Sequence, residues 1–183
     1  MMWPWLLGGF LGYFGYKGWK RTQGIVKEPE IGSVLCCDLF GNIAEHSGIY
    51  VGNNRIVELL STGEVVQSSP KGFVDGLPFA TEIYVFAKHQ KTGETNAKGE
   101  EYVPSVGLKE VAKKAQEYVG KKFKYAKVPN SEEYNCHKFV CHCLLGEKDD
   151  NSYTLTDIKK AIRRCYKLSD EEAGFYEWDV KLS

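Results

Sequence analysis

A short segment in the first third of the chain constrains its fold most strongly. Residues 46–52 and 55–60 are two runs rich in aliphatic side chains, and Gly52-Asn53-Asn54 stands between them. Asn and Gly tolerate the positive φ angles that a tight hairpin turn requires, so this pattern is typical of two antiparallel strands joined by a short turn. The domain is therefore expected to contain an antiparallel sheet that includes this hairpin.

Further strands are predicted on both sides of the hairpin. Apolar runs next to turn-forming residues predict strands over residues 32–38, 64–68 and 81–86. Residues 23–30 are expected to form a connector, and the polar stretch 89–102 is expected to be an exposed loop. The first half of the chain is thus predicted to be a meander of strands.

The second half of the chain has the spacing of helices. Apolar residues recur at helical intervals over residues 106–119, and residues 135–145 predict a buried helix that ends before a glycine. A last helix is predicted to begin at Thr154 or Thr156, either of which can cap it, and to run through Cys165. Strands followed by helices in a chain of 183 residues, without an internal repeat, indicate one α+β domain.

The N-terminal segment is uncharged and rich in aromatic residues. Residues 1–16 contain no charged side chain, and Lys and Arg residues follow within positions 17–21. A signal peptide has its positive charge before the apolar run, and a spanning helix needs roughly 20 apolar residues. Three interpretations stay open: an anchor on a membrane surface, a short or tilted spanning helix, and an arm packed on the domain. The chain is divided into this candidate anchor, residues 1–22, with residues 1–21 as its membrane contact, and a domain over residues 23–183.

The charge and the cysteine content of the chain limit its possible partners and its cellular compartment. Lys plus Arg and Asp plus Glu each number 24, so no general basic field is available to bind nucleic acid, and no nucleic-acid partner is expected. The six cysteines include adjacent and nearly adjacent pairs, which is not the spacing of a disulfide framework. Reduced thiols without a signal-peptide pattern favour the cytoplasm, or a membrane with the domain facing the cytoplasm.

Cys136 is the candidate nucleophile. It stands at the predicted N-terminus of a buried helix, directly after Asn135. At that place the helix dipole and unpaired backbone N–H groups favour the thiolate, and they can stabilise an oxyanion on a substrate. From position alone, a buried structural cysteine is the competing interpretation.

His46 and Glu58 are its candidate partners. His46 opens the first strand of the predicted hairpin, and Glu58 lies on the second strand, nearly opposite to it. A carboxylate beside a histidine fixes the tautomer and stabilises the imidazolium form, as expected for a general base and the residue that orients it. A plain surface ion pair is the competing interpretation.

These residues lie in two motifs that resemble those of the lecithin:retinol acyltransferase (LRAT) family. The motifs here are Glu45-His-Ser-Gly-Ile-Tyr-Val-Gly-Asn-Asn-Arg-Ile-Val-Glu-Leu59 and Asn135-Cys-His-Lys-Phe-Val140. The family pattern is His-x-x-Ile-Tyr-x-Gly, a second polar residue twelve positions after the histidine, and Asn-Cys-Glu-His-Phe-Val. The resemblance covers residues 30–146, with clear motifs at these two places.

The resemblance implies a fold and a chemistry. The family is a circularly permuted branch of the papain-like NlpC superfamily, so its histidine precedes its cysteine. The expected α+β fold is therefore permuted papain-like (NlpC-type), an antiparallel strand meander followed by helices that include the nucleophile helix. Cys136 resembles the nucleophile, His46 the general base and Glu58 the orienting residue, with Asn135 and Ser47 as candidate oxyanion or positioning residues. The implied reaction is acyl transfer or acyl hydrolysis through an acyl-thioester, from an ester, thioester or amide of a lipid or other small acyl substrate.

The chain departs from the family pattern beside the predicted site. Vertebrate members have a second histidine where this chain has Glu58, and His137 and Lys138 replace the Glu-His that follows the nucleophile. A carboxylate can take the orienting role of the second histidine, so the three-residue core is intact. The departures bear on the choice of substrate.

Three alternatives stay open. Five soft ligands lie within eight residues, namely Cys136, His137, Cys141, His142 and Cys143. One helix cannot close a tetrahedral site with these side chains, so neither a metal nor another cofactor is expected. An NlpC-type cysteine peptidase or amidase would keep the fold and change the bond that is cleaved. A non-catalytic, membrane-associated binding module would not need all three residues of the core.

Overall fold

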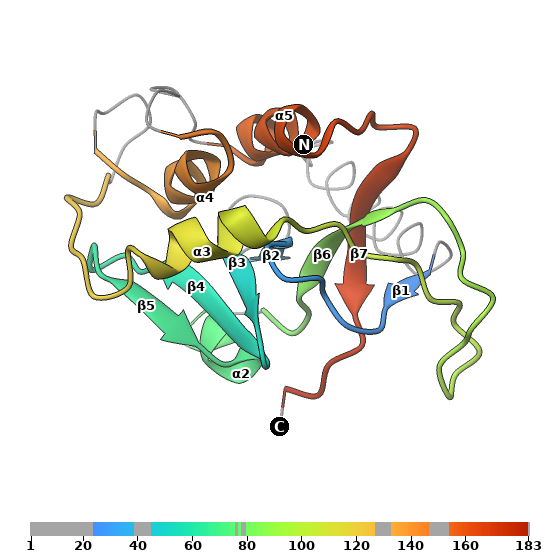
Figure 1. Cartoon of the computed structure of the whole chain (residues 1–183). Helices are drawn as coiled ribbons and strands as arrows, with labels where there is room; N and C mark the ends of the chain where they lie inside the picture. The colour runs from blue at the N-terminus through green and yellow to red at the C-terminus, as the bar shows by residue number, and fades with distance from the viewer. Residues whose placement is uncertain are drawn as a thin grey trace, which may run out of the picture.

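The computed structural model describes residues 24–38, 45–75, 77, 80–126, 133–146 and 154–182, and the candidate anchor over residues 1–22 lies outside them. The strands of this part of the chain are β1 (Ile25–Val26), β2 (Val34–Asp38), β3 (Glu45–Gly52), β4 (Arg55–Leu59), β5 (Val65–Ser68), β6 (Tyr84–Lys88) and β7 (Ala173–Trp178). They form one sheet in the order β1-β7-β6-β2-β3-β4-β5 (Figure 1). Neighbouring strands are antiparallel, except that β1 and β7 are parallel.

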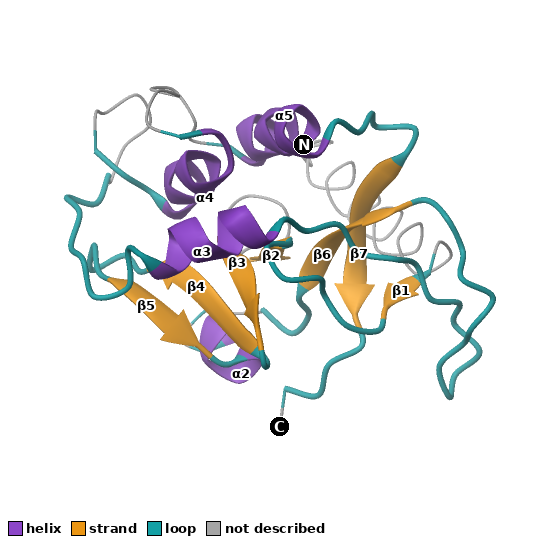
Figure 2. Cartoon of the chain, viewed as in Figure 1, coloured by secondary structure: helices purple, strands orange, loops and turns teal. Residues whose placement is uncertain are grey.

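Helices cover both faces of this sheet. Those in the described part of the chain are α2 (Pro70–Val74), α3 (Lys109–Gln116), α4 (Cys136–Leu145) and α5 (Leu155–Tyr166). Helices α3, α4 and α5 lie together on one side of the sheet, which we call the helix face, and α2 lies on the other side, the α2 face (Figures 1 and 2). The sheet is therefore enclosed between two hydrophobic layers.

The apolar run of β2 supplies both layers. Val34 and Cys36 pack with the helix-face core, whereas Leu35 and Cys37 pack with the core on the α2 face, because successive side chains of a strand point to opposite sides. Helix α4 contacts β3 and β4 below it and α3 and α5 beside it. Every side chain of α4 from Cys136 to Leu144 is buried as a result, as the sequence predicted for this helix.

The hairpin and the α+β class are confirmed. Asn53 and Asn54 both have positive φ angles, of 53° and 52°, and they form the two-residue turn between β3 and β4. The predicted strands and helices that flank this hairpin are present, with bounds shifted by a few residues.

The predicted meander holds only from β2 to β5 and is corrected elsewhere. After β5 the chain forms α2, and β6 then pairs with β2 on its other side, Leu35 facing Val85. Strand β1 lies within the predicted connector, and β7 comes from the C-terminal end of the chain. The sequence showed neither, because a two-residue strand has no periodicity and the pairing of β7 with β6 is long-range.

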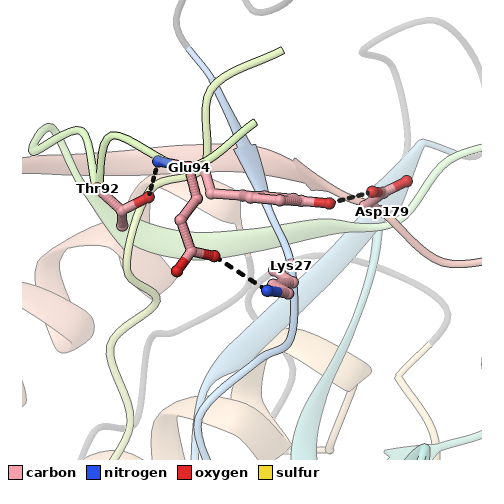
Figure 3. Close-up of polar contacts among 5 residues, drawn as sticks. Lys27, Thr92, Glu94 and Asp179 are labelled. Atoms are coloured by element: carbon pink, nitrogen blue, oxygen red, sulfur yellow. Dashed lines mark hydrogen bonds and ion pairs between the residues drawn. The ribbon is translucent and has the colours of Figure 1, made fainter. Parts of the chain in front are cut away.

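Exposed polar contacts join the loop between β6 and α3 to both ends of the described chain (Figure 3). Lys27 Nζ lies 3.0 Å from Glu94 Oε2, and the Tyr102 hydroxyl donates to Asp179 Oδ2 at 2.8 Å. The Glu94 N–H donates to Thr92 Oγ1 at 3.3 Å. Exposed pairs of this kind each contribute at most about 1 kcal/mol, so they position the loop more than they stabilise the fold.

Candidate active site

Cys136 is the first residue of α4, and its position is fixed by a helix cap. The Asn135 side chain accepts a hydrogen bond from the Lys138 N–H at 2.7 Å, which satisfies one of the unpaired donors of the first turn. The thiol is buried, with 5% of the residue exposed. Cys136 therefore stands at the positive end of a helix inside the protein, where a thiolate is favoured. The structure places Asn135 as the cap of this helix.

His46 on β3 and Glu58 on β4 contact each other across the hairpin. His46 Nε2 lies 2.5 Å from Glu58 Oε2, and both residues are buried. The expectation that they stand nearly opposite is corrected by two residues of the register. The turn at Asn53 and Asn54 and an irregularity between Tyr50 and Gly52 place Glu58 opposite Gly48, so His46 is its diagonal neighbour on the same face.

Gly48 makes this diagonal contact sterically available. It lies between His46 and Glu58 in the register, and it carries no side chain. A Cβ at this position would come within 2.8 Å of Ile56 Cγ2 and 3.0 Å of Phe73 Cε2. The Phe73 ring from α2 in turn packs on the His46 ring, with 4.9 Å between the ring centroids. The imidazole is thus held between a carboxylate and an aromatic ring.

The electrostatics favour a charged pair of Cys136 and His46. Burial lowers the pKa of His46, but hydrogen bonds with Cys136 and Glu58 raise it to about 9. Burial raises the pKa of the Cys136 thiol, but the charges and hydrogen bonds of His137 and His46 have the opposite and larger effect. The pKa of this thiol is therefore well below that of an ordinary cysteine. Because Nε2 of His46 contacts Glu58, Nδ1 is the ring nitrogen that remains for the thiol. A thiolate and an imidazolium can therefore coexist in this buried place.

Two further side chains touch the thiol, and the sequence reasoning assigned neither of them to the site. His137 Nδ1 lies 3.9 Å from Cys136 Sγ and 2.9 Å from Ser47 Oγ. Burial, the charge of Cys136 and a hydrogen bond with its side chain raise the pKa of the Tyr125 phenol to about 12. The position of His137 next to Cys136 was a usable signal. Tyr125 gave no signal, because it lies in a loop eleven residues before Cys136.

The remaining soft ligands of α4 are used elsewhere in the fold. His142 lies between two hydroxyls, with Tyr118 at 2.7 Å from its Nε2 and Tyr134 at 3.2 Å from its Nδ1. Burial raises the pKa of Cys143 to about 12, so its thiol stays protonated at neutral pH. In the part of the chain that the structure describes, no group of three or more His, Cys, Asp or Glu side chains is arranged to hold a metal ion.

Comparison with known protein families identifies the domain. The family model described as lecithin retinol acyltransferase matches residues 27–149, which is more than half of the chain. The chain belongs to the lecithin retinol acyltransferase family. The match includes β3, β4 and α4, so the site just described lies within the region that the family model covers.

Two further findings accompany this family assignment. No individual curated protein matches the chain. Among the described residues, no helix combines the length and the apolar character that a membrane crossing requires.

Proposed function

We propose that this protein is a cysteine-dependent acyltransferase or acyl hydrolase that forms an acyl-thioester on Cys136. The observation that carries the proposal is the buried row Glu58, His46 and Cys136, in which the thiol at the start of α4 has a pKa well below its ordinary value. A buried cysteine with only a structural role would have a raised pKa, as Cys143 does on the same helix. Membership of the family supports acyl chemistry.

The first half of the reaction follows from this geometry. The Cys136 thiolate attacks the carbonyl carbon of an ester, thioester or amide, and the carbonyl oxygen becomes an oxyanion. Backbone N–H groups at the N-terminus of α4 can stabilise this negative charge. When the carbonyl re-forms, the bond to the leaving group breaks, and the leaving group takes a proton from the His46 imidazolium. The products are an acyl-thioester on Cys136 and a neutral His46.

The second half regenerates the enzyme. Water or an acceptor alcohol or amine gives a proton to His46 as it attacks the thioester carbonyl, and the Cys136 thiolate leaves. His46 is then imidazolium again, and Glu58 stabilises that charge at Nε2 in both halves. A circularly permuted papain-like arrangement fits this chemistry, since the histidine strand precedes the nucleophile helix in the chain.

The substrate class and the location are part of the proposal. An acyl-bearing lipid or another small acyl compound is the substrate that family membership favours. The aromatic segment over residues 1–22, which is uncharged up to residue 16 and then basic, would hold the domain at a membrane surface that faces the cytoplasm, close to such substrates. Membrane partitioning that is unchanged after deletion of residues 1–20 would remove this second inference.

An active-site label tests the proposed nucleophile. The full chain is treated with a thiol-reactive acyl probe, and the modified residue is located by mass spectrometry. We expect acylation of Cys136 that is lost in Cys136→Ala and weakened in His46→Ala. Cys143→Ser is the matched control, because this buried thiol on the same helix has a raised pKa and should not contribute. Equal labelling of the unchanged protein, Cys136→Ala and His46→Ala would contradict the proposal.

A substrate panel then separates the acyl classes. Phospholipids, acyl-thioesters and short peptides are supplied with and without an acceptor amine or alcohol. Acyl products from the lipid or thioester substrates are expected. Turnover of the peptides alone would replace the proposed reaction with that of a peptidase.

A further inference from the structure

His137 occupies a place that the three-residue core does not explain. It is the second residue of α4, and it is buried although histidine is polar. Its Nδ1 faces two partners at once, Ser47 Oγ at 2.9 Å and Cys136 Sγ at 3.9 Å. Ser47 is completely buried and directly follows His46 on β3. Two consecutive residues of β3 therefore contact two consecutive residues of α4, and the thiol is touched by an imidazole from each element.

The state of protonation decides what His137 offers to the thiol. With the proton on Nε2, Nδ1 is only an acceptor, and the Ser47 hydroxyl donates to it. With Nδ1 protonated, the N–H donates to Ser47 Oγ and can be shared with Cys136 Sγ, and the ring is positively charged only when Nε2 also carries a proton. A thiolate beside the ring favours the second state. Ser47 accommodates both states because a hydroxyl can donate or accept.

The electrostatics of the thiol point to the same residue. The pKa of Cys136 is lowered by the charge and the hydrogen bond of His137 first, and by those of His46 after them. The Tyr125 phenol also faces the thiol. His137 is therefore a principal partner of the thiolate.

We propose that His137, with its ring fixed by Ser47, is a second positioning residue for the Cys136 thiolate, which it stabilises through Nδ1. This inference rests on the proposed function of Cys136 as nucleophile.

The experiment measures how the reactivity of Cys136 depends on pH. The full chain is alkylated with iodoacetamide between pH 5 and pH 9, and the modification of Cys136 alone is quantified by peptide mass spectrometry. In His137→Asn, which keeps a polar group but no charge, we expect the profile to move to higher pH and the rate at pH 6 to fall about tenfold. Ser47→Ala, which frees the ring, should give a smaller shift in the same direction.

His142→Asn is the matched control. This histidine is buried on the same helix and bonded to two tyrosine hydroxyls, so its replacement affects the stability of α4 without touching the thiol. Its pH profile should overlay that of the unchanged protein. A shift as large as that of His137→Asn would mean that the effect is a general response of the helix, and it would overturn the inference.

The sign of the interaction is tested with a carboxylate. His137→Glu places a negative charge near the thiolate and should slow alkylation at pH 6 more than His137→Asn does. An equal or faster rate would overturn the inference. If His46→Asn shifts the profile and His137→Asn does not, this inference fails and the proposed nucleophile stands. If the unchanged protein already reacts like an ordinary thiol, both fail.

Discussion

Replacement of Glu58 by glutamine should impair acylation at alkaline pH and leave it nearly intact at pH 6.5. The carboxylate holds His46 Nε2 at 2.5 Å in a buried site and helps to raise the pKa of His46 to about 9. A hydrogen bond to a charged group contributes about 2 kcal/mol, so its loss should lower the pKa of His46 to about 7.5. His46 must be protonated to supply the leaving group with a proton. At pH 8.5 the protonated fraction would fall about eightfold, and at pH 6.5 it would hardly change.

The assay measures the rate at which an alkyl ester acylates Cys136. The reaction is quenched at a series of times, and the acylated fraction is determined by mass spectrometry of the intact protein. A p-nitrophenyl ester of the same acyl group is the matched substrate, because its leaving group departs without a proton and the alkaline defect should shrink. Glu58→Gln that loses the same factor at pH 6.5 and pH 8.5, with both esters, would refute the reasoning. That result would mean that Glu58 supports the fold and does not set the pKa of His46.

Three further predictions concern the residues around the thiol. Gly48→Ala should reduce the free energy of unfolding by about 1–3 kcal/mol, because the new Cβ would lie only 2.8–3.0 Å from its neighbours. Gly72→Ala, whose Cβ would have its nearest neighbour at 3.4 Å, should not have this effect. Denaturant unfolding measures both variants. Tyr125→Phe removes a hydroxyl bonded to the thiolate, so alkylation of the nucleophile at pH 5 should slow about tenfold, and an unchanged rate would exclude the hydroxyl from the site. Asn135→Ala should destabilise the protein by about 1 kcal/mol and slow acylation, whereas Thr154→Ala, which removes the cap of α5, should destabilise it similarly with unchanged acylation.

The sequence predicted the parts of the fold that depend on local chemistry. The turn at Asn53 and Asn54 was predictable because few residue pairs adopt two consecutive positive φ angles. The buried helix α4 was predictable from its apolar residues and from the glycine that follows it. Strand β7 was missed because its pairing with β6 depends on residues far away in the chain. Helix α2 had a signal, with Ser69 as cap and Pro70 at its start, but five residues are too few for a helical period to show.

The residues of the site also divide into those that the sequence predicted and those that it could not. His46, Glu58 and Cys136 could be named from motifs, but the register that joins the first two needed the structure, since a displacement of one residue turns a side chain to the other face. Tyr125 could not be named, because only the folded loop brings its hydroxyl to the start of α4.

The pKa values imply that the members of this site depend on one another. Burial opposes the charge on both Cys136 and His46, so each charge exists only because its partners compensate. Once His46 is removed, Glu58 has no ring to orient and cannot help the thiol. His46→Ala and the double variant His46→Ala with Glu58→Ala should therefore lose acylation by the same factor. If the two losses multiply instead, as measured by single-turnover acylation at pH 8.5, Glu58 acts on the reaction by a route that does not pass through the imidazole.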